Sequence, residues 1–198
     1  MFVVTADQVS SRTTADRVGD TLRRLNRELG DRLSLPADRT AGDELQLLVT
    51  TGADALEICL RLDREGGWSV GVGVGSVNLP LGAGVRESAG GAFIAARAAV
   101  DRAKRRSTRL AIEHEHSPEA AGDAEALIDL LLILRARRSS EGWELHDLLA
   151  GSGTQAEAAA RLGITPQAAS KRAQAAGLRA ERAAIPPLAR LLDRIDHP

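Results

Sequence analysis

Residues 154–177 carry polar side chains at the spacing with which a helix contacts DNA. Their sequence, TQAEAAARLGITPQAASKRAQAAG, has the pattern of two short helices joined by a tight turn at Gly163 and Ile164. Alanines let such helices pack closely, so the polar side chains of the second helix face outward. The side chains expected to contact base edges or phosphates are those of Thr154, Gln155, Thr165, Gln167, Ser170, Lys171, Arg172 and Gln174.

Capping signals and local charge support this interpretation. Thr154 with Glu157 forms a capping box, and Thr165 followed by Pro166 opens the second helix. Five basic residues and one acidic residue lie between Arg161 and Arg182, an excess that would attract phosphates. The segment resembles the helix-turn-helix of bacterial regulators and of sigma-factor region four. A helical hairpin that contacts protein, such as the transcription machinery, is the alternative.

Composition sets limits on the other classes of function. The 198 residues are 43% hydrophobic and 27% charged, with a formal charge of −1, which is typical of a globular protein. Cys59 is the only cysteine, so disulfides within the chain and cysteine-built metal sites are excluded. The most apolar run, from Leu127 to Leu134, is too short to span a membrane. A cytoplasmic protein that does not contact membranes is expected.

The rest of the chain alternates strands and helices before it becomes wholly helical. The expected order is strand, helix, hairpin, helix, strand, helix, strand, over residues 3–4, 13–30, 38–49, 53–65, 68–77, 89–104 and 109–113. This βαββαβ order with an αβ extension predicts an α+β fold, a ferredoxin-like palm with helices on one face of the sheet. The expected domains are a palm at 1–116, a linker at 117–123 and an all-α helix-turn-helix domain at 124–198.

Several other patterns have purely structural explanations. The glycines at 71, 73 and 75 alternate with valines, which would let a helix lie close to a central strand. Basic residues at 104–106 and at 135, 137 and 138 end two expected helices, where cations are favoured by the helix dipole.

Three short stretches of the front domain resemble nucleotide cyclases. Residues 3–7, VVTAD, resemble the first strand of class III cyclases, which ends in a magnesium-binding Asp. Residues 39–45, RTAGDEL, resemble the cyclase hairpin and the GGDEF signature of diguanylate cyclases. Residues 70–75 followed by 90–97, GGAFIAAR, resemble the cyclase strand and helix that face the active site. With its C-terminal helix-turn-helix, the chain resembles the SatD-like family.

The resemblance implies a site for Mg²⁺ and a purine nucleotide or cyclic dinucleotide. Asp7 and Asp43 would hold the metal, because hard cations prefer carboxylate oxygens. Backbone N–H groups after the first strand would meet phosphate. The expected nucleotide contacts are Asp7, Gln8, Ser10, Ser11, Arg39, Gly42, Asp43, Glu44 and Arg97. Structurally, an Asp after a strand also caps helices and Gly-Asp marks turns.

Departures from the cyclase pattern argue against turnover. Phe93 stands where the cyclases have their transition-state Asn, and a phenyl ring donates no hydrogen bond to developing charge. Arg39 stands where they have a base-reading Lys. The sequence therefore predicts a homodimeric bacterial transcription regulator. Its helix-turn-helix domain would bind double-stranded DNA, and its non-catalytic, cyclase-like palm would bind a nucleotide-type ligand, dimerise, or both. An active purine nucleotide cyclase with a helical tether is an alternative.

Overall fold

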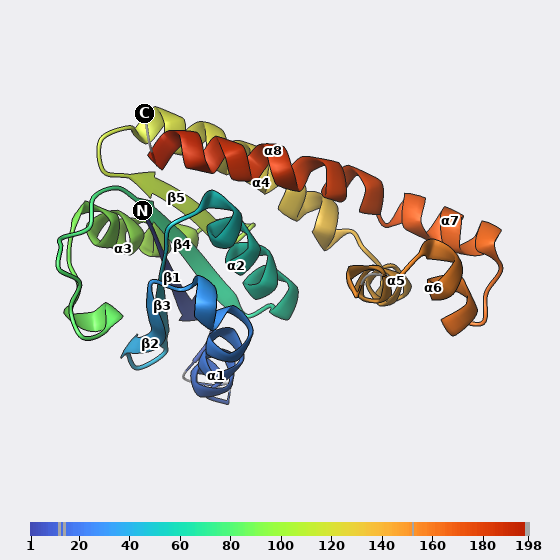
Figure 1. Ribbon diagram of the computed structural model, residues 1–198, viewed down its shortest axis with the longest axis horizontal. Coiled ribbons are helices and arrows are strands. Elements are labelled where there is room, and N and C mark those ends of the chain that lie inside the picture. Colours follow the sequence, from blue (N-terminus) through green and yellow to red (C-terminus); the bar gives the residue numbers. More distant parts are fainter. Residues whose placement is uncertain (12, 14, 152, 197–198) are drawn as a thin grey trace. The chain divides into compact units, whose positions relative to one another are not determined.

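The protein is a mixed α+β structure, seen in a computed structural model that describes residues 1–11, 13, 15–151 and 153–196 (Figure 1). The strands are β1 Phe2–Gln8, β2 Leu35–Ala41, β3 Glu44–Val49, β4 Trp68–Val74 and β5 Leu110–His114. The α-helices are α1 Val18–Leu29, α2 Gly52–Glu65, α3 Gly91–Ala103, α4 Pro118–Ala136, α5 Ser140–Ala150, α6 Gln155–Arg161, α7 Pro166–Ala175 and α8 Leu178–Asp196. This order agrees with the order expected from the sequence.

The five strands form one mixed sheet in the order β2-β3-β1-β4-β5. The central strand β1 is antiparallel to both neighbours, whereas β4 and β5 are parallel. Phe2, Val3 and Val4 have no exposed surface, because β1 is paired on both edges and covered on both faces. The β2–β3 hairpin turns at Gly42, whose φ of +36° is a conformation that glycine adopts readily.

Helices cover both faces of the sheet, so the expectation of one covered face is wrong. A Cβ on Gly73 would lie 2.1 Å from the Ala92 carbonyl oxygen and 2.2 Å from the Ala96 nitrogen, both in α3. The structural explanation of the alternating glycines is therefore confirmed. Figure 1 shows α1 and α2 on the other side of the strands from α3.

Helix α1 starts at Val18, several residues later than expected. The buried Gln8 side chain donates to the Ala15 carbonyl (2.7 Å) and accepts from the Arg17 N–H (3.0 Å). These two bonds hold the chain outside the helix until Arg17. Thr14, within the expected helix, lies outside the described residues.

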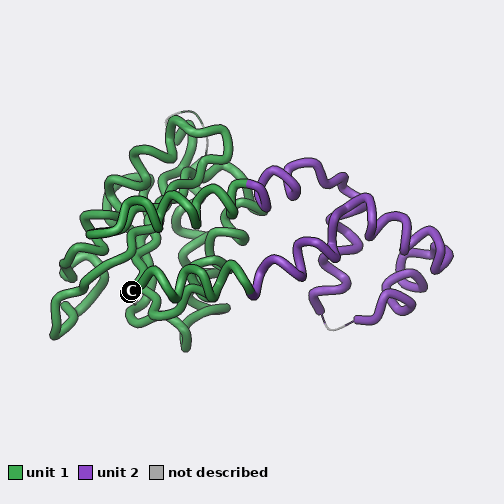
Figure 2. The backbone as a smooth tube through the Cα atoms, turned by 90° about the horizontal axis from the view of Figure 1, so that it is seen from above, with its two compact units in different colours: residues 1–129, 187–198 green, residues 130–186 purple. Residues whose placement is uncertain are grey.

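The chain divides into two compact units, residues 1–129 with 187–198 and residues 130–186 (Figure 2). Of residues 117–123, expected to be a linker, all but Ser117 belong to the start of α4. Ala121 in this segment and Ala124 just after it are buried, and the next residue, Glu125, accepts from the Ile112 N–H (2.8 Å) and pairs with Arg102 (2.6 Å). Packing of small side chains and a buried carboxylate therefore place this segment in the first unit.

A buried polar cluster lies inside the second unit. The Glu181 carboxylate pairs with the Arg135 and Arg138 guanidinium groups, and all three side chains are at most 4% exposed. Both guanidinium groups also lie over the Trp143 ring, 4.8 and 4.2 Å from its centroid. The helix dipole therefore explains Arg135 and Arg138 only in part, because their charges also face a buried partner.

Within the described ranges, no helix has both the length and the apolar character that a membrane span needs.

Candidate functional site

A polar hollow of about 490 Å³ opens beside the ends of β1 and β4. Its lining combines carboxylates, cations, hydroxyls and backbone of the loop after β1. The lining residues are Asp7, Gln8, Val9, Ser10, Ser11, Thr13, Asp43, Ser69, Lys104 and Arg109. Asp7, Gln8, Ser10, Ser11 and Asp43 were expected from the sequence to lie at one site, and the structure brings them together.

Strand pairing positions the two aspartates. Asp7 is in register with Glu44, the residue after Asp43, and the Gln8 N–H donates to the Asp43 carbonyl (3.0 Å). The Ser11 hydroxyl donates to Asp43 Oδ2. Because the hairpin and β1 end at the same edge, carboxylates 36 positions apart in sequence border one hollow.

Two cations in this hollow were missed by the sequence analysis. Lys104 Nζ, just after α3, lies 2.9 Å from Asp7 Oδ2. Burial lowers the pKa of Lys104, but its contacts with Asp7 and Asp101 together outweigh this effect and hold the pKa above its usual value. Arg109 has a left-handed φ of +54° and donates to the Ser69 hydroxyl (3.3 Å). For Lys104, the run of basic residues at 104–106 was the signal available in the sequence.

Arg39 and Gly42 line a neighbouring hollow of about 300 Å³, with Asp43 on its border. The Arg39 guanidinium donates to both carboxylate oxygens of Asp16, at 2.9 and 2.7 Å, and to the Gly42 carbonyl at 2.7 Å. The hydrogen bond from Arg39 is the main reason that the pKa of Asp16 lies below its usual value. Arg39 is therefore held by an acid that the sequence analysis did not select.

Glu44 and Arg97 pair with each other and do not line either of these hollows. Arg97 donates to one Glu44 oxygen and the Thr40 hydroxyl donates to the other, both at 2.6 Å. Phe93, one turn before Arg97, packs against an apolar cluster that contains Val3. The position thus presents an apolar ring and no hydrogen-bond donor.

The donor set of the larger hollow fits a magnesium–phosphate ligand. Mg²⁺ is usually held by one or two carboxylates together with phosphate oxygens and water, and Asp7 and Asp43 are two such carboxylates. Lys104, Arg109 and the backbone at 9–11 would meet the remaining negative charge of the phosphates. Among the described residues, no group of three or more His, Cys, Asp or Glu is arranged to hold a metal by itself.

The helix pair of the second unit has the local geometry that its sequence predicts. Thr154 accepts from the Glu157 N–H (3.2 Å) and Glu157 accepts from the Thr154 N–H (2.7 Å), which completes the capping box. Thr165 accepts from the Ala168 N–H (3.1 Å), and Gly163 has a φ of +63°. The hydroxyls of Thr154 and Thr165 therefore serve as helix caps.

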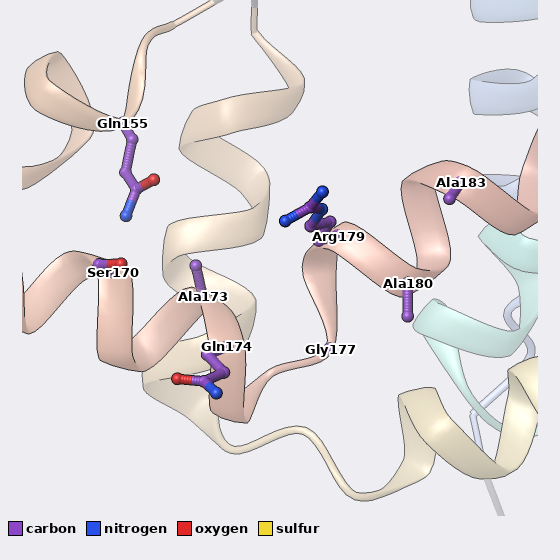
Figure 3. Close-up of a pocket in the computed structure, with 8 residues that line it drawn as sticks. All are labelled: Gln155, Ser170, Ala173, Gln174, Gly177, Arg179, Ala180 and Ala183. Carbon is purple, nitrogen blue, oxygen red and sulfur yellow. The ribbon is translucent and has the colours of Figure 1, made fainter.

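The outward side chains of α7 and its neighbours surround a hollow of about 770 Å³. Figure 3 shows Gln155 of α6 reaching toward Ser170 of α7, with Gln174 further along α7 and Arg179 at the start of α8. Gln167 and Lys171 are exposed on α7. Arg172 instead lies 3.5 Å from Glu144 of α5 and is 24% exposed. Arg179 was not among the residues selected from the sequence.

The chain was compared with protein-family models, with curated proteins and with solved structures, and none of them matched.

Proposed function

We propose that this protein is a cytoplasmic DNA-binding transcription regulator of the SatD-like kind. Helices α6 and α7 would form its helix-turn-helix, and the sheet unit would be a ferredoxin-like, cyclase-derived palm. The observation that carries the proposal is the pair of capped helices around Gly163, which leaves Gln167, Ser170 and Lys171 exposed on the second helix. Such a helix places its N-terminal side chains in the major groove.

Local charge supports contact with DNA. Arg161, Lys171, Arg179 and Arg182 are exposed, while Glu181, an acid in the same stretch, is buried between two arginines. The buried Glu181 carboxylate therefore does not offset the charge of these exposed cations, which would attract DNA phosphates.

The test is selection of binding sequences from random duplexes by the full chain, followed by affinity measurements. Lys171→Ala with Arg179→Ala should weaken binding to every selected duplex, and Gln167→Ala with Gln174→Ala should relax base preference by about 1–3 kcal/mol. Arg86→Ala with Arg105→Ala, which removes two exposed cations of the sheet unit, is the matched control. Failure of the wild type to select any duplex would support the protein-interaction alternative.

A second function is supported by the hollow around Asp7. Two carboxylates, two cations and serine hydroxyls at one strand edge suit a nucleotide-type ligand bound with Mg²⁺. The protein's own groups would orient the phosphates and hold the metal at Asp7 and Asp43. Because Phe93 lies in an apolar cluster, binding without turnover is proposed.

Calorimetric titration with ATP, GTP and cyclic dinucleotides, with and without Mg²⁺, tests this second function. Asp43→Asn should abolish the Mg²⁺-dependent part of binding, and Asp38→Asn, an exposed acid in the same hairpin, should not. Chromatography of the incubated nucleotides tests the alternative of an active nucleotide cyclase, because such an enzyme would release a cyclic product. Absence of any binding would leave the palm as a scaffold.

A further inference from the structure

Helix α4 has an exposed apolar face. Leu127, Leu130 and Ile133 are 48%, 64% and 45% exposed, and they follow one another at intervals of three residues. At about 100° per residue, they lie within roughly 60° of the direction of Leu130. Ala126, on the same side, is also exposed. Large apolar side chains grouped on one helix face are typical of a surface that a partner covers.

The opposite side of α4 is occupied by its own chain. Ile128, Leu131 and Leu132 are at most 4% exposed, and Arg135 carries the buried pair with Glu181. The helix α4 therefore has a second apolar face besides the one that packs against its own chain. An ordinary surface helix has one apolar stripe and carries polar residues on its exposed side.

Charges border this face in a self-complementary way. Asp123 lies one turn before the apolar residues and Arg137 directly follows α4, and both are exposed. On an ideal helical wheel continued by one residue to Arg137, both positions fall within roughly 20° of Leu130. Among the described residues, neither forms an ion pair. Leu130 is midway between them in sequence, as it is midway between Leu127 and Ile133.

We infer that this face of α4 pairs with the same face of a second copy of the chain, in an antiparallel helix pair centred on Leu130. A twofold axis at Leu130 places Asp123 of each copy opposite Arg137 of the other, and Leu127 opposite Ile133. The symmetry of the sequence about Leu130 satisfies both charges at once. A parallel arrangement would instead place like charges together, which disfavours it.

Sedimentation equilibrium of the full chain tests this arrangement. Leu130→Glu puts two carboxylates at the axis and should raise the dimer dissociation constant at least about tenfold, as expected for the centre of an interface. Ile94→Glu makes the same change at a 75% exposed apolar residue of α3 and should leave the dimer unchanged. A wild type that is monomeric at high micromolar concentration overturns the inference.

Charge exchange gives a second measurement that does not depend on Leu130. Asp123→Arg or Arg137→Asp alone should weaken the dimer, because like charges then face each other across the axis. The double variant Asp123→Arg with Arg137→Asp should restore it. Single variants that associate as well as the wild type would overturn the antiparallel register.

Cross-linking locates the axis directly. Helix axes 8–10 Å apart bring facing Cα atoms within reach of a disulfide, so Leu130→Cys should form a covalent dimer under mild oxidation. Ile94→Cys serves as the control. The native Cys59 is 2% exposed, and burial raises the pKa of its thiol to about 12, so it stays unreactive. Equal cross-linking of both variants would overturn the inference.

Discussion

The ammonium group of Lys104 lies 2.9 Å from the Asp7 carboxylate. Asp7 is the second-last residue of the central strand and Lys104 follows the helix that covers it, so the contact joins the two elements at the candidate ligand site. A metal bound at Asp7 would compete with this ammonium group. The pair therefore sets how readily the carboxylate accepts Mg²⁺.

Replacing Lys104 should change metal and phosphate binding in opposite directions. In Lys104→Met, Mg²⁺ no longer competes with an ammonium group, and its affinity should rise about two- to fivefold, since partly exposed pairs contribute about 0.5–1 kcal/mol. Affinity for a nucleotide without Mg²⁺ should fall, because one cation is lost. Calorimetry measures both affinities, and Lys104→Arg should keep the wild-type pattern. Unchanged Mg²⁺ affinity in Lys104→Met would argue against Asp7 as a ligand.

Lys171 and Arg172 should differ in their effect on the salt dependence of DNA binding. Lys171 is exposed, whereas Arg172 lies 3.5 Å from Glu144. Lys171→Ala should therefore reduce the slope of log affinity against log salt by about 1, as expected for one lost phosphate contact. Arg172→Ala should change the slope by less. Anisotropy titrations at several salt concentrations give both slopes, and equal losses would show that Arg172 leaves Glu144 to contact DNA.

Acid should destabilise the second unit through Glu181. Burial raises the pKa of this carboxyl, but its ion pairs with Arg138 and Arg135 lower the pKa by a larger amount. The pKa in the folded protein therefore lies below the ordinary 4.5. The stabilisation is fully present above the unfolded pKa and is lost as the pH falls through the lower, folded pKa. Fluorescence of Trp143 in a Trp68→Phe background should follow the loss, because Trp143 stacks on both arginines.

Glu181→Gln should remove most of this acid dependence. It should also cost about 3–5 kcal/mol at neutral pH, because it leaves two buried cations without their counter-charge. Glu144→Gln, at a 61% exposed carboxylate, is the control and should cost under about 1 kcal/mol. Equal effects of the two substitutions in urea unfolding would contradict a stabilising role for the buried cluster.

Gly73→Ala should destabilise the sheet unit strongly. Its added Cβ would meet the backbone of α3 at 2.1 Å, so the helix must move away from β4. Overpacking of this kind typically costs about 1–3 kcal/mol, and contact with backbone places it at the upper end. Gly84→Ala is the matched control, since its Cβ meets nothing within 4 Å and its φ is −152°. Thermal unfolding that is equal for both variants would show that α3 adapts without cost.

The sequence by itself determined the features that depend on neighbours in the chain. The helix caps at Thr154 and Thr165 bond to N–H groups three residues away, and the hairpin turns at Gly42. The alternation of glycine with valine in β4 identified a strand that a helix approaches closely. Such signals are read directly because propensity and capping act over a few residues.

Only the tertiary structure decided which distant residues meet. Lys104 forms an ion pair with Asp7. Glu44 pairs with Arg97, which is 53 positions away in the sequence. Arg135 and Glu181 likewise meet across 46 positions. A charged side chain at a helix end looks the same in sequence whether it faces water or a buried carboxylate, because the helix dipole favours it in both cases. Packing selects between these environments by removing water from one face of each helix, and that face is fixed by the whole chain.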